Sequence, residues 1–471
     1  MLRFFCTFVL SVTFSVAICQ PRQLIETFMS KGSIPGLFVA VVKGDTVLYQ
    51  QSFGFADKEN SLPLTDTTCM ELGSISKIFT AEVIYELVGS GKISVKDPIR
   101  KFLPLAPPSW SGITIHHLLT HTSGIQNYLL DPRFFAAEYF TNQSHPAASE
   151  FFSAITPDSM VQMFYSLPLE FEPSLTWSYS NTGYYLLGKI GEVTTGKPFF
   201  QLVADKVTAP LGMKRTHANE NARRAGCLAK GYFPADSSLV EARFLHSNYA
   251  FSAGAWATTG EDMIRFLKAN HKRRLPSDKS QLDLRKPHTK HILPFTYEGG
   301  RFFTTFHGLT ITSHNGGTPG FSSSWINVVD KNLSVILLMN RQDYAPIDQL
   351  AWDVLSYFDP ALTYPEKERH GADEVAMSQK LLALLTALKT NAPFPNGLSK
   401  PLLKFLLTEN GKGYWRWYFE RGFPVNARCV DVEKTTNANL YRFILSLSDD
   451  IIYRLSILAN KDGEIMQMRW W

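Results

Sequence analysis

Cysteine is scarce in this chain, and its spacing does not fit the usual cysteine-based sites. The 471 residues include five cysteines, and Cys6 and Cys19 fall within or at the edge of an apolar N-terminal segment. Cys69, Cys227 and Cys429 remain, an odd number without Cys-x-x-Cys spacing. The sequence therefore indicates neither a disulfide framework nor a zinc site, and it leaves open whether one disulfide forms.

Dense basic stripes, internal repeats and low-complexity tracts are also missing. The net charge is only +5, and the one basic run, residues 271–274, lies among prolines and serines as a solvated loop would. We therefore expect no nucleic-acid partner. With 45% hydrophobic and 19% charged residues, the chain is ordinary for a globular protein, and its length allows two or three domains.

A single apolar run at the N-terminus predicts export. It follows a positive charge, covers residues 4–18 and ends in small residues that suit a signal peptidase. It is shorter than the roughly 18–20 residues of a spanning helix, so we expect a signal peptide over residues 1–19 and no membrane span in the mature chain. The protein is then secreted or periplasmic. Cys19 also allows lipoprotein anchoring, which the bulky Ile18 disfavours.

Strand patterns in two distant parts of the chain enclose a largely helical region. A hairpin is predicted near the start and a second one before residue 340, with helical patterns and long loops between them. The predicted strands cover residues 36–42, 46–50, 309–312, 323–329 and 334–339, and the predicted helices include 22–31, 74–92 and 346–358. We expect an α/β (α+β) fold in which one sheet is assembled from distant segments and a helical lobe is inserted.

The composition changes after residue 360. Residues 361–375 are predicted as a linker between a main domain (20–360) and a small C-terminal α+β accessory domain (376–471). The accessory domain has one helical run followed by four strand candidates. Its aromatic run, residues 414–418, either packs a core or forms a platform for a sugar or a partner.

A serine and a lysine one helical turn apart are the first candidates for chemistry. If a helix opens at Ser74, the amine of Lys77 lies on the same face and can reach the hydroxyl. A partly desolvated lysine can accept the serine proton, and unpaired N–H groups at a helix start suit an oxyanion. The same pattern also arises by chance as an N-cap serine before a solvated lysine, so other motifs must decide.

Two later segments offer groups that could complete such a site. Tyr179 and Asn181 stand in a loop ahead of an apolar helix, where a phenol can relay a proton and a carboxamide can bind a substrate amide or the lysine. A capped helix start with core tyrosines is the alternative. His314 follows a predicted strand and precedes Gly316 and Gly317, which allow close backbone approach and a second oxyanion donor.

A pair of histidines has a spacing that can hold a metal. His117 and His121 stand at i and i+4, but no glutamate accompanies them as in His-Glu-x-x-His, and no third ligand is evident. We therefore predict structural histidines, no metal and no cofactor.

In their order along the chain, these motifs resemble the class C β-lactamase and penicillin-binding serine hydrolase family over roughly residues 22–360. The motifs are Ile34-Pro35-Gly36, Ser74-Ile75-Ser76-Lys77, the segment 115–124, Tyr179-Ser180-Asn181 and His314-Asn315-Gly316. The resemblance implies a β-lactamase/transpeptidase-like fold, with an antiparallel sheet flanked by helices and an active site between the sheet and a helical lobe.

The resemblance also implies acyl-transfer chemistry. Ser74 would form an acyl-enzyme, and Lys77 and Tyr179 would move its proton, with the acylation base left open between them. Backbone N–H groups of Ser74 and Gly317, next to Gly316, would form the oxyanion hole. Asn181 would orient the substrate or Lys77, and His314 would occupy the first position of the third motif.

His314 departs from the lysine usual at this position in the β-lactamases themselves. Histidine is only partly charged at neutral pH, so it should bind a substrate carboxylate less strongly than lysine. We therefore predict a secreted serine hydrolase of esters or peptide-like amides. The alternatives are a D-Ala-D-Ala carboxypeptidase or D-aminopeptidase, a β-lactamase, and a non-catalytic penicillin- or peptide-binding or scaffold protein. The oligomeric state stays open.

Overall fold

Two compact units are present in the computed structural model. It describes residues 21–131, 133–134, 155–235, 238–275, 277, 295–342, 347–365, 367–407, 423–424, 426–434, 438–446 and 452–470. The first unit runs to residue 288 and takes in 297–361, and the second comprises 289–296 and 362–471. The predicted signal peptide, with Cys19, and the aromatic run 414–418 lie outside the described residues.

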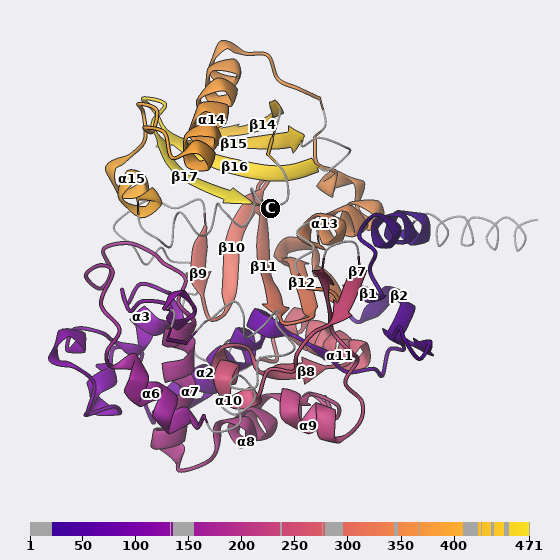
Figure 1. Ribbon diagram of the computed structural model, residues 1–471, viewed down its shortest axis with the longest axis vertical. Helices are drawn as coiled ribbons and strands as arrows, with labels where there is room; N and C mark the ends of the chain where they lie inside the picture. Colours follow the sequence, from indigo (N-terminus) through magenta and orange to yellow (C-terminus); the bar gives the residue numbers. More distant parts are fainter. Residues whose placement is uncertain are drawn as a thin grey trace, which may run out of the picture. The chain divides into compact units, whose positions relative to one another are not determined.

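An eight-stranded sheet forms the centre of the first unit, as predicted from the two distant strand regions. The order of its strands is β3-β2-β1-β13-β12-β11-β10-β9, and the pairings from β3 to β10 are antiparallel (Figure 1). The strands are β1 (Gly36–Lys43), β2 (Thr46–Asp57), β3 (Leu62–Pro63), β9 (Thr296–Glu298), β10 (Arg301–Phe306), β11 (Leu309–Thr318), β12 (Phe321–Val328) and β13 (Leu333–Met339). Every residue of β12 and β13 is buried, so these central strands are covered on both faces.

Helices cover the two faces of this sheet. In β12, the Trp325 ring lies 6.3 Å from Phe266 of α11 (Gly260–His271), whereas the Ser324 hydroxyl donates to Asp348 of α13 (Ile347–Phe358). Because neighbouring residues of a strand point to opposite faces, α11 and α13 lie on opposite sides of the sheet. Helix α13 agrees with the predicted helix over the described residues.

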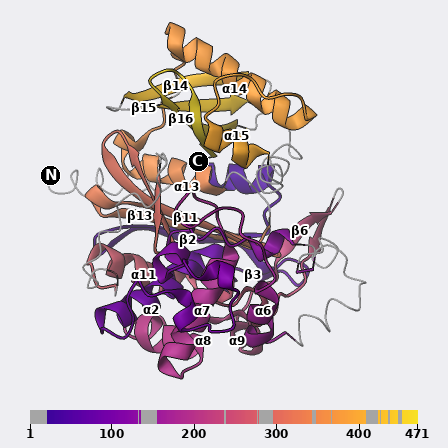
Figure 2. The same ribbon diagram turned by 90° about the vertical axis from the view of Figure 1, so that its left-hand side faces the viewer.

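The helical region between the two strand groups forms a lobe in which α2, α7 and α10 pack against one another (Figures 1 and 2). Its helices are α2 (Ser76–Gly89), α3 (Ile115–Leu119), α6 (Pro157–Phe164), α7 (Asn181–Thr195), α8 (Phe199–Val203), α9 (Asn219–Arg224) and α10 (Ser247–Gly254). Close packing of α7 on α10 requires a glycine, since a Cβ on Gly188 would lie 2.2 Å from Ser252 Oγ. Among the described residues, no helix is long and apolar enough to cross a membrane.

Short helical turns connect these elements. They are η1 (Gly73–Ile75), η2 (Ile99–Lys101), η3 (Pro108–Trp110), η4 (Tyr128–Leu130), the π-helical η5 (Ala204–Thr208), η6 (Val329–Lys331) and η7 (Pro360–Leu362). The chain before β1 is helical over residues 21–31, where the sequence predicted a helix.

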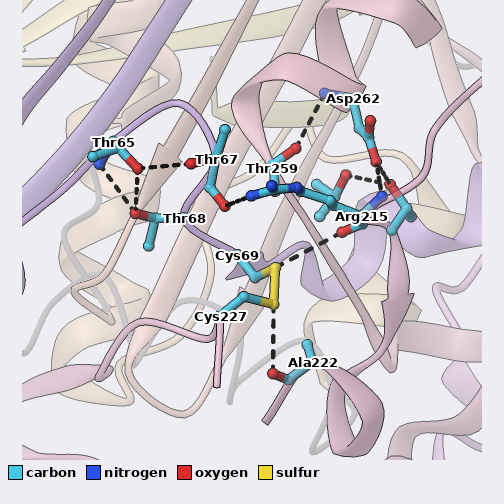
Figure 3. Close-up of a disulfide and its surroundings, with 11 residues drawn as sticks. Thr65, Thr67, Thr68, Cys69, Arg215, Ala222, Cys227, Thr259 and Asp262 are labelled. Carbon is cyan, nitrogen blue, oxygen red and sulfur yellow. Dashed lines mark hydrogen bonds between the residues drawn. A yellow bond between two sulfur atoms is a disulfide. The ribbon is translucent and has the colours of Figure 1, made fainter. Parts of the chain in front are cut away.

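A disulfide that the sequence left open joins Cys69 to Cys227 across 158 residues (Figure 3). Cys69 directly precedes β4 (Met70–Glu71), which belongs to a three-stranded sheet with β8 (Trp256–Thr258) and β5 (His217–Ala218). A separate hairpin is formed by β6 (Tyr232–Ala235) and β7 (Ser238–Glu241). Because β4 leads into the turn that carries Ser74, the disulfide anchors the chain segment just before the candidate nucleophile.

The second unit is a small α+β module. Its antiparallel sheet has the order β14-β15-β16-β17, and α14 packs on β14 while α15 packs on β17. The bounds are α14 (Ala372–Thr390), α15 (Lys400–Leu406), β14 (Asn426–Lys434), β15 (Ala438–Ser446), β16 (Ile452–Asn460) and β17 (Ile465–Trp470). Helix α14 begins inside the segment predicted as a linker. Arg442 is fully buried and forms ion pairs with Asp431 and Glu433. These two carboxylates compensate the positive charge of the buried guanidinium.

Candidate active site

Ser74 and Lys77 meet as the sequence predicts, although the helix starts later. Ser74 lies in the 3-10 turn η1, and α2 begins at Ser76, so Lys77 stands in the first turn of α2. Lys77 Nζ lies 3.0 Å from Ser74 Oγ. The tight turn leaves Ser74 half-buried at the surface of the lobe while Lys77 points inward.

Lys77 is fully buried and held by two obligate acceptors. Its Nζ lies 2.7 Å from Asn181 Oδ1 and 2.6 Å from the carbonyl oxygen of Ala253. Ala253 is in the last turn of α10, where carbonyl groups lack helical partners. Burial lowers the pKa of Lys77 well below its ordinary value. Since no carboxylate is among these partners, desolvation is not offset by an ion pair.

Tyr179 stands beside the lysine. Lys77 Nζ lies 5.0 Å from the centroid of the Tyr179 ring. The Tyr179 hydroxyl is buried and makes no well-formed hydrogen bond to the described residues. Burial raises the pKa of Tyr179 well above its ordinary value, and the nearby Ser74 hydroxyl only partly opposes this shift. The phenol is therefore neutral at pH 7.

Asn181 is the first residue of α7 rather than part of the preceding loop. Its backbone N–H and its side-chain Nδ2 both lie close to Asn127 Oδ1, at 3.2 and 3.3 Å. Asn127 thus caps the start of α7 and fixes the carboxamide that holds Lys77. No motif in the sequence indicated Asn127 or the Ala253 carbonyl as part of the site.

The third motif lies within strand β11, whereas the sequence predicted that it follows a strand. In the β11–β12 register His314 pairs with Trp325 and Asn315 with Ser324, so His314 faces the lobe and Asn315 faces α13. Asn315 Nδ2 donates to Asp348 of α13 at 2.7 Å. His314 is buried, with its Nε2 3.0 Å from Tyr297 Oη. The side chain of Asn315 is therefore directed away from Ser74.

Glycines let β11 touch the turn that carries Ser74. A Cβ on Gly316 would lie 1.9 Å from the Leu72 carbonyl oxygen and 2.9 Å from Ser74 N. Gly73 has φ +53, and a Cβ there would lie 2.5 Å from Gly317 N. Only residues without a Cβ fit this contact. It places the exposed backbone of Gly317 beside Ser74, where the sequence predicted a second oxyanion donor.

The two histidines with metal-like spacing do not share a helix face. His117 lies in α3 and caps its start by accepting from Thr114 N, and burial lowers the pKa of His117 to about 4. His121 follows α3, has φ +57 and is buried. Within the part of the chain that the structure describes, no group of three metal-ligating side chains occurs.

A serine and a buried lysine between a helical lobe and an antiparallel sheet are typical of a serine hydrolase. The sequence model of the Beta-lactamase family matches residues 21–356, so the chain belongs to this family. Penicillin-binding protein 4* of Bacillus subtilis (strain 168) is 29% identical over 354 residues, which cover 70% of this chain and 73% of that protein. Esterase EstB of Burkholderia gladioli is 32% identical over 184 residues, 38% of this chain and 46% of the esterase. The chain covers 64% of protein flp of Staphylococcus aureus (strain MW2), at 26% identity.

Solved structures share the fold. The octameric penicillin-binding protein homologue from Pyrococcus abyssi superposes with a TM-score of 0.64 at 21% identity, covering 95% of this chain and 99% of that one. A D-stereospecific amidohydrolase from Streptomyces sp. gives a TM-score of 0.60 at 24% identity, covering 73% and 99%. The β-lactamase/transpeptidase-like fold predicted from the motifs is confirmed.

Proposed function

We propose that this protein is an exported serine hydrolase that forms an acyl-enzyme on Ser74 and acts on esters or peptide-like amides. The observation that carries the proposal is the environment of Lys77, which has three hydrogen-bond partners and no counter-charge among the described residues around its amine. A serine placed against a neutral amine is an activated nucleophile.

The number of partners supports Lys77 as the acylation base. A neutral amine has two N–H groups and one lone pair, and the oxygens of Asn181 and Ala253 can only accept. They take both N–H groups, which leaves the lone pair for the Ser74 hydroxyl. Burial favours this neutral form, because it disfavours charge on Lys77. Tyr179 is a poorer base, since its buried phenol holds its proton firmly.

The reaction then proceeds in two steps. Ser74 Oγ attacks the carbonyl carbon as its proton passes to Lys77, and the N–H groups of Ser74 and Gly317 stabilise the oxyanion. The C–O or C–N bond to the leaving group breaks, and that group takes up a proton through Tyr179, which Lys77 reprotonates. Water repeats the sequence on the acyl-enzyme and releases Ser74 with the acid product.

The proposed substrate class rests on His314 in β11. His314 replaces a permanently charged lysine and is engaged with Tyr297, which favours substrates without a carboxylate at this position. The similarity to esterase EstB supports ester substrates, and the similarity to a penicillin-binding protein supports peptide-like amides. Activity as a D-peptidase or β-lactamase remains the alternative for the same machinery.

Export is the second part of the proposal. The Cys69–Cys227 disulfide supports it, since such bonds persist in oxidising compartments and are rare in the cytosol.

The test compares wild type with Ser74→Ala on short-chain nitrophenyl esters, D-amino-acid peptides, a chromogenic cephalosporin and a fluorescent penicillin. Mass spectrometry of the intact protein locates any adduct. We expect turnover and a Ser74 adduct in wild type only. Identical behaviour of the two proteins on all substrates, with no adduct on Ser74, contradicts an enzymatic function. Rapid cephalosporin hydrolysis without esterase activity would contradict the substrate class alone.

A further inference from the structure

His121 holds the peptide groups on both sides of Tyr179. Its carbonyl oxygen accepts from the backbone N–H of Ser178 at 3.0 Å, and its side-chain Nδ1 accepts from the backbone N–H of Ser180 at 3.2 Å. Tyr179 lies between these two anchoring points. One residue of the segment after α3 thereby fixes the backbone that carries the candidate proton donor.

The imidazole also packs on the Tyr179 side chain. Its centroid lies 4.4 Å from the Tyr179 ring and 4.4 Å from the Tyr297 ring, with Tyr184 at 5.0 Å. The Tyr297 hydroxyl in turn contacts His314. The ring of His121 therefore limits both the position and the tilt of the phenol next to Ser74.

These contacts account for the type of residue at position 121. The backbone there is left-handed, with φ +57, a conformation in which asparagine, aspartate and histidine are enriched among residues other than glycine. Nδ1 can accept from Ser180 only while it carries no proton. Burial lowers the pKa of His121 well below its ordinary value, which keeps the ring neutral. Its Nε2 makes no hydrogen bond to the described residues, so the accepting contact at Nδ1 is its polar anchor.

We propose that His121 is a positioning residue that aligns Tyr179 with Ser74 for proton transfer to the leaving group. The proposal rests on the proposed function, because this alignment affects rate only if Tyr179 delivers a proton. His121 acts through Tyr179, and among the described residues no hydrogen bond joins its side chain to Ser74 or Lys77.

Two substitutions separate the accepting atom from the backbone conformation. His121→Asn tolerates the left-handed backbone and can place Oδ1 near the position of Nδ1, whereas His121→Gly allows the same backbone without any acceptor. Displacements of about 1 Å can cost roughly 100-fold in rate. We expect His121→Gly to lower kcat by about 10- to 100-fold with little change in KM, and His121→Asn to stay within about 3-fold of wild type.

The dependence of kcat on the leaving group distinguishes a role in proton transfer from a merely structural role. A nitrophenolate leaves without a proton, whereas an alkoxide or an amine needs one. The kcat loss in His121→Gly should therefore be larger on an alkyl ester of the same acid than on its nitrophenyl ester, as in Tyr179→Phe. The double variant should lose little more than Tyr179→Phe alone, because both changes remove one function.

Hydrogen exchange tests the contact without relying on activity. In His121→Gly the Ser180 amide should lose protection, while His121→Asn keeps it and thermal unfolding shows both variants folded. If His121→Gly does not fold, His121→Gln, whose acceptor lies one bond further out, takes its place. Equal losses on both esters, additivity with Tyr179→Phe, or unchanged Ser180 protection overturns the proposal. A wild type without any hydrolysis but with the expected exchange pattern would contradict the proposed function and the catalytic role of His121, while leaving its contact with Ser180 established.

Discussion

Ser74 lies between two parts of the first unit that contribute to the site in different ways. The helical side, formed by α2 and the segment that leads into α7, supplies side chains whose proton affinity is changed by burial, namely Lys77 and Tyr179. The strand side, β11, supplies backbone that can approach Ser74 only because Gly316 has no side chain. On the helical side, the site depends on the polar atoms of Lys77 and Tyr179. On the strand side, it depends on the absence of a Cβ atom at Gly316.

This difference predicts opposite sensitivities. Removing a polar atom on the helical side should abolish chemistry while the backbone stays in place. Adding a single methyl group on the strand side should have a comparable effect by moving the backbone. A substitution that removes a polar atom should therefore be most harmful on the helical side, and one that adds a methyl group should be most harmful on the strand side.

The largest effect is expected for Lys77→Met. The variant keeps an apolar chain of similar length but lacks the amine, so kcat/KM for an ester should fall by about 10³- to 10⁴-fold. Lys92→Met, just beyond the end of the same helix and exposed, is the matched control and should behave as wild type. Steady-state kinetics on a nitrophenyl ester measures both. A loss below tenfold in Lys77→Met would show that another group is the base.

A second prediction concerns neighbouring glycines on the strand side. In Gly316→Ala the new Cβ meets the Leu72 carbonyl oxygen at 1.9 Å, so β11 must move away from Ser74. We expect kcat/KM to fall by about 10²- to 10³-fold, the usual cost of an impaired oxyanion hole. Gly317→Ala is the control, because its Cβ meets nothing nearer than the Phe321 carbonyl oxygen at 4.0 Å. Equal losses in the two variants would contradict the distinction between the two positions.

The Cys69–Cys227 disulfide next to β4 should matter for stability more than for rate. Replacing Cys69 and Cys227 together by alanine removes a crosslink across 158 residues, and the free energy of unfolding should fall by about 2–5 kcal/mol. Urea unfolding measures this change, and kcat/KM at 25 °C should stay within about tenfold of wild type. Cys429→Ala in the second unit is the control for loss of a buried sulfur. A double variant as stable as wild type would show that the disulfide is not formed.

The helical side was easier to predict from the sequence than the strand side. Ser74 and Lys77 are close in sequence, so helical geometry alone brings them together, and the family motifs placed Tyr179 and Asn181 nearby. β11 was predicted to end at Thr312, because glycines weaken a strand pattern although here they allow a close backbone contact. The Ala253 carbonyl and the acceptor role of His121 depend on contacts between distant segments, and a backbone carbonyl has no sequence signature. The same holds for the pairing of Cys69 with Cys227.

Glu71 extends the comparison, since it is a titratable group whose side chain contacts Thr318 at the end of β11. It lies in β4, is buried, and burial raises its pKa to about 8 from 4.5, partly opposed by a contact with Thr318. In the unfolded chain Glu71 loses its proton near pH 4.5, whereas in the folded protein it keeps it to about pH 8. The unfolded state therefore binds fewer protons between these values, and stability falls as the pH rises through this window.

Glu71→Gln keeps the shape of the protonated acid and removes its titration. We expect the variant to be about 1–3 kcal/mol more stable than wild type at pH 8 and equally stable at pH 4. Urea unfolding at both pH values tests this, with the exposed Glu26→Gln as the control. A constant difference between variant and wild type at the two pH values would show that Glu71 does not titrate in this window. If the difference grows with pH while kcat at pH 7 is unchanged, the charge on Glu71 changes the free energy of unfolding without taking part in catalysis, unlike the charge on Lys77.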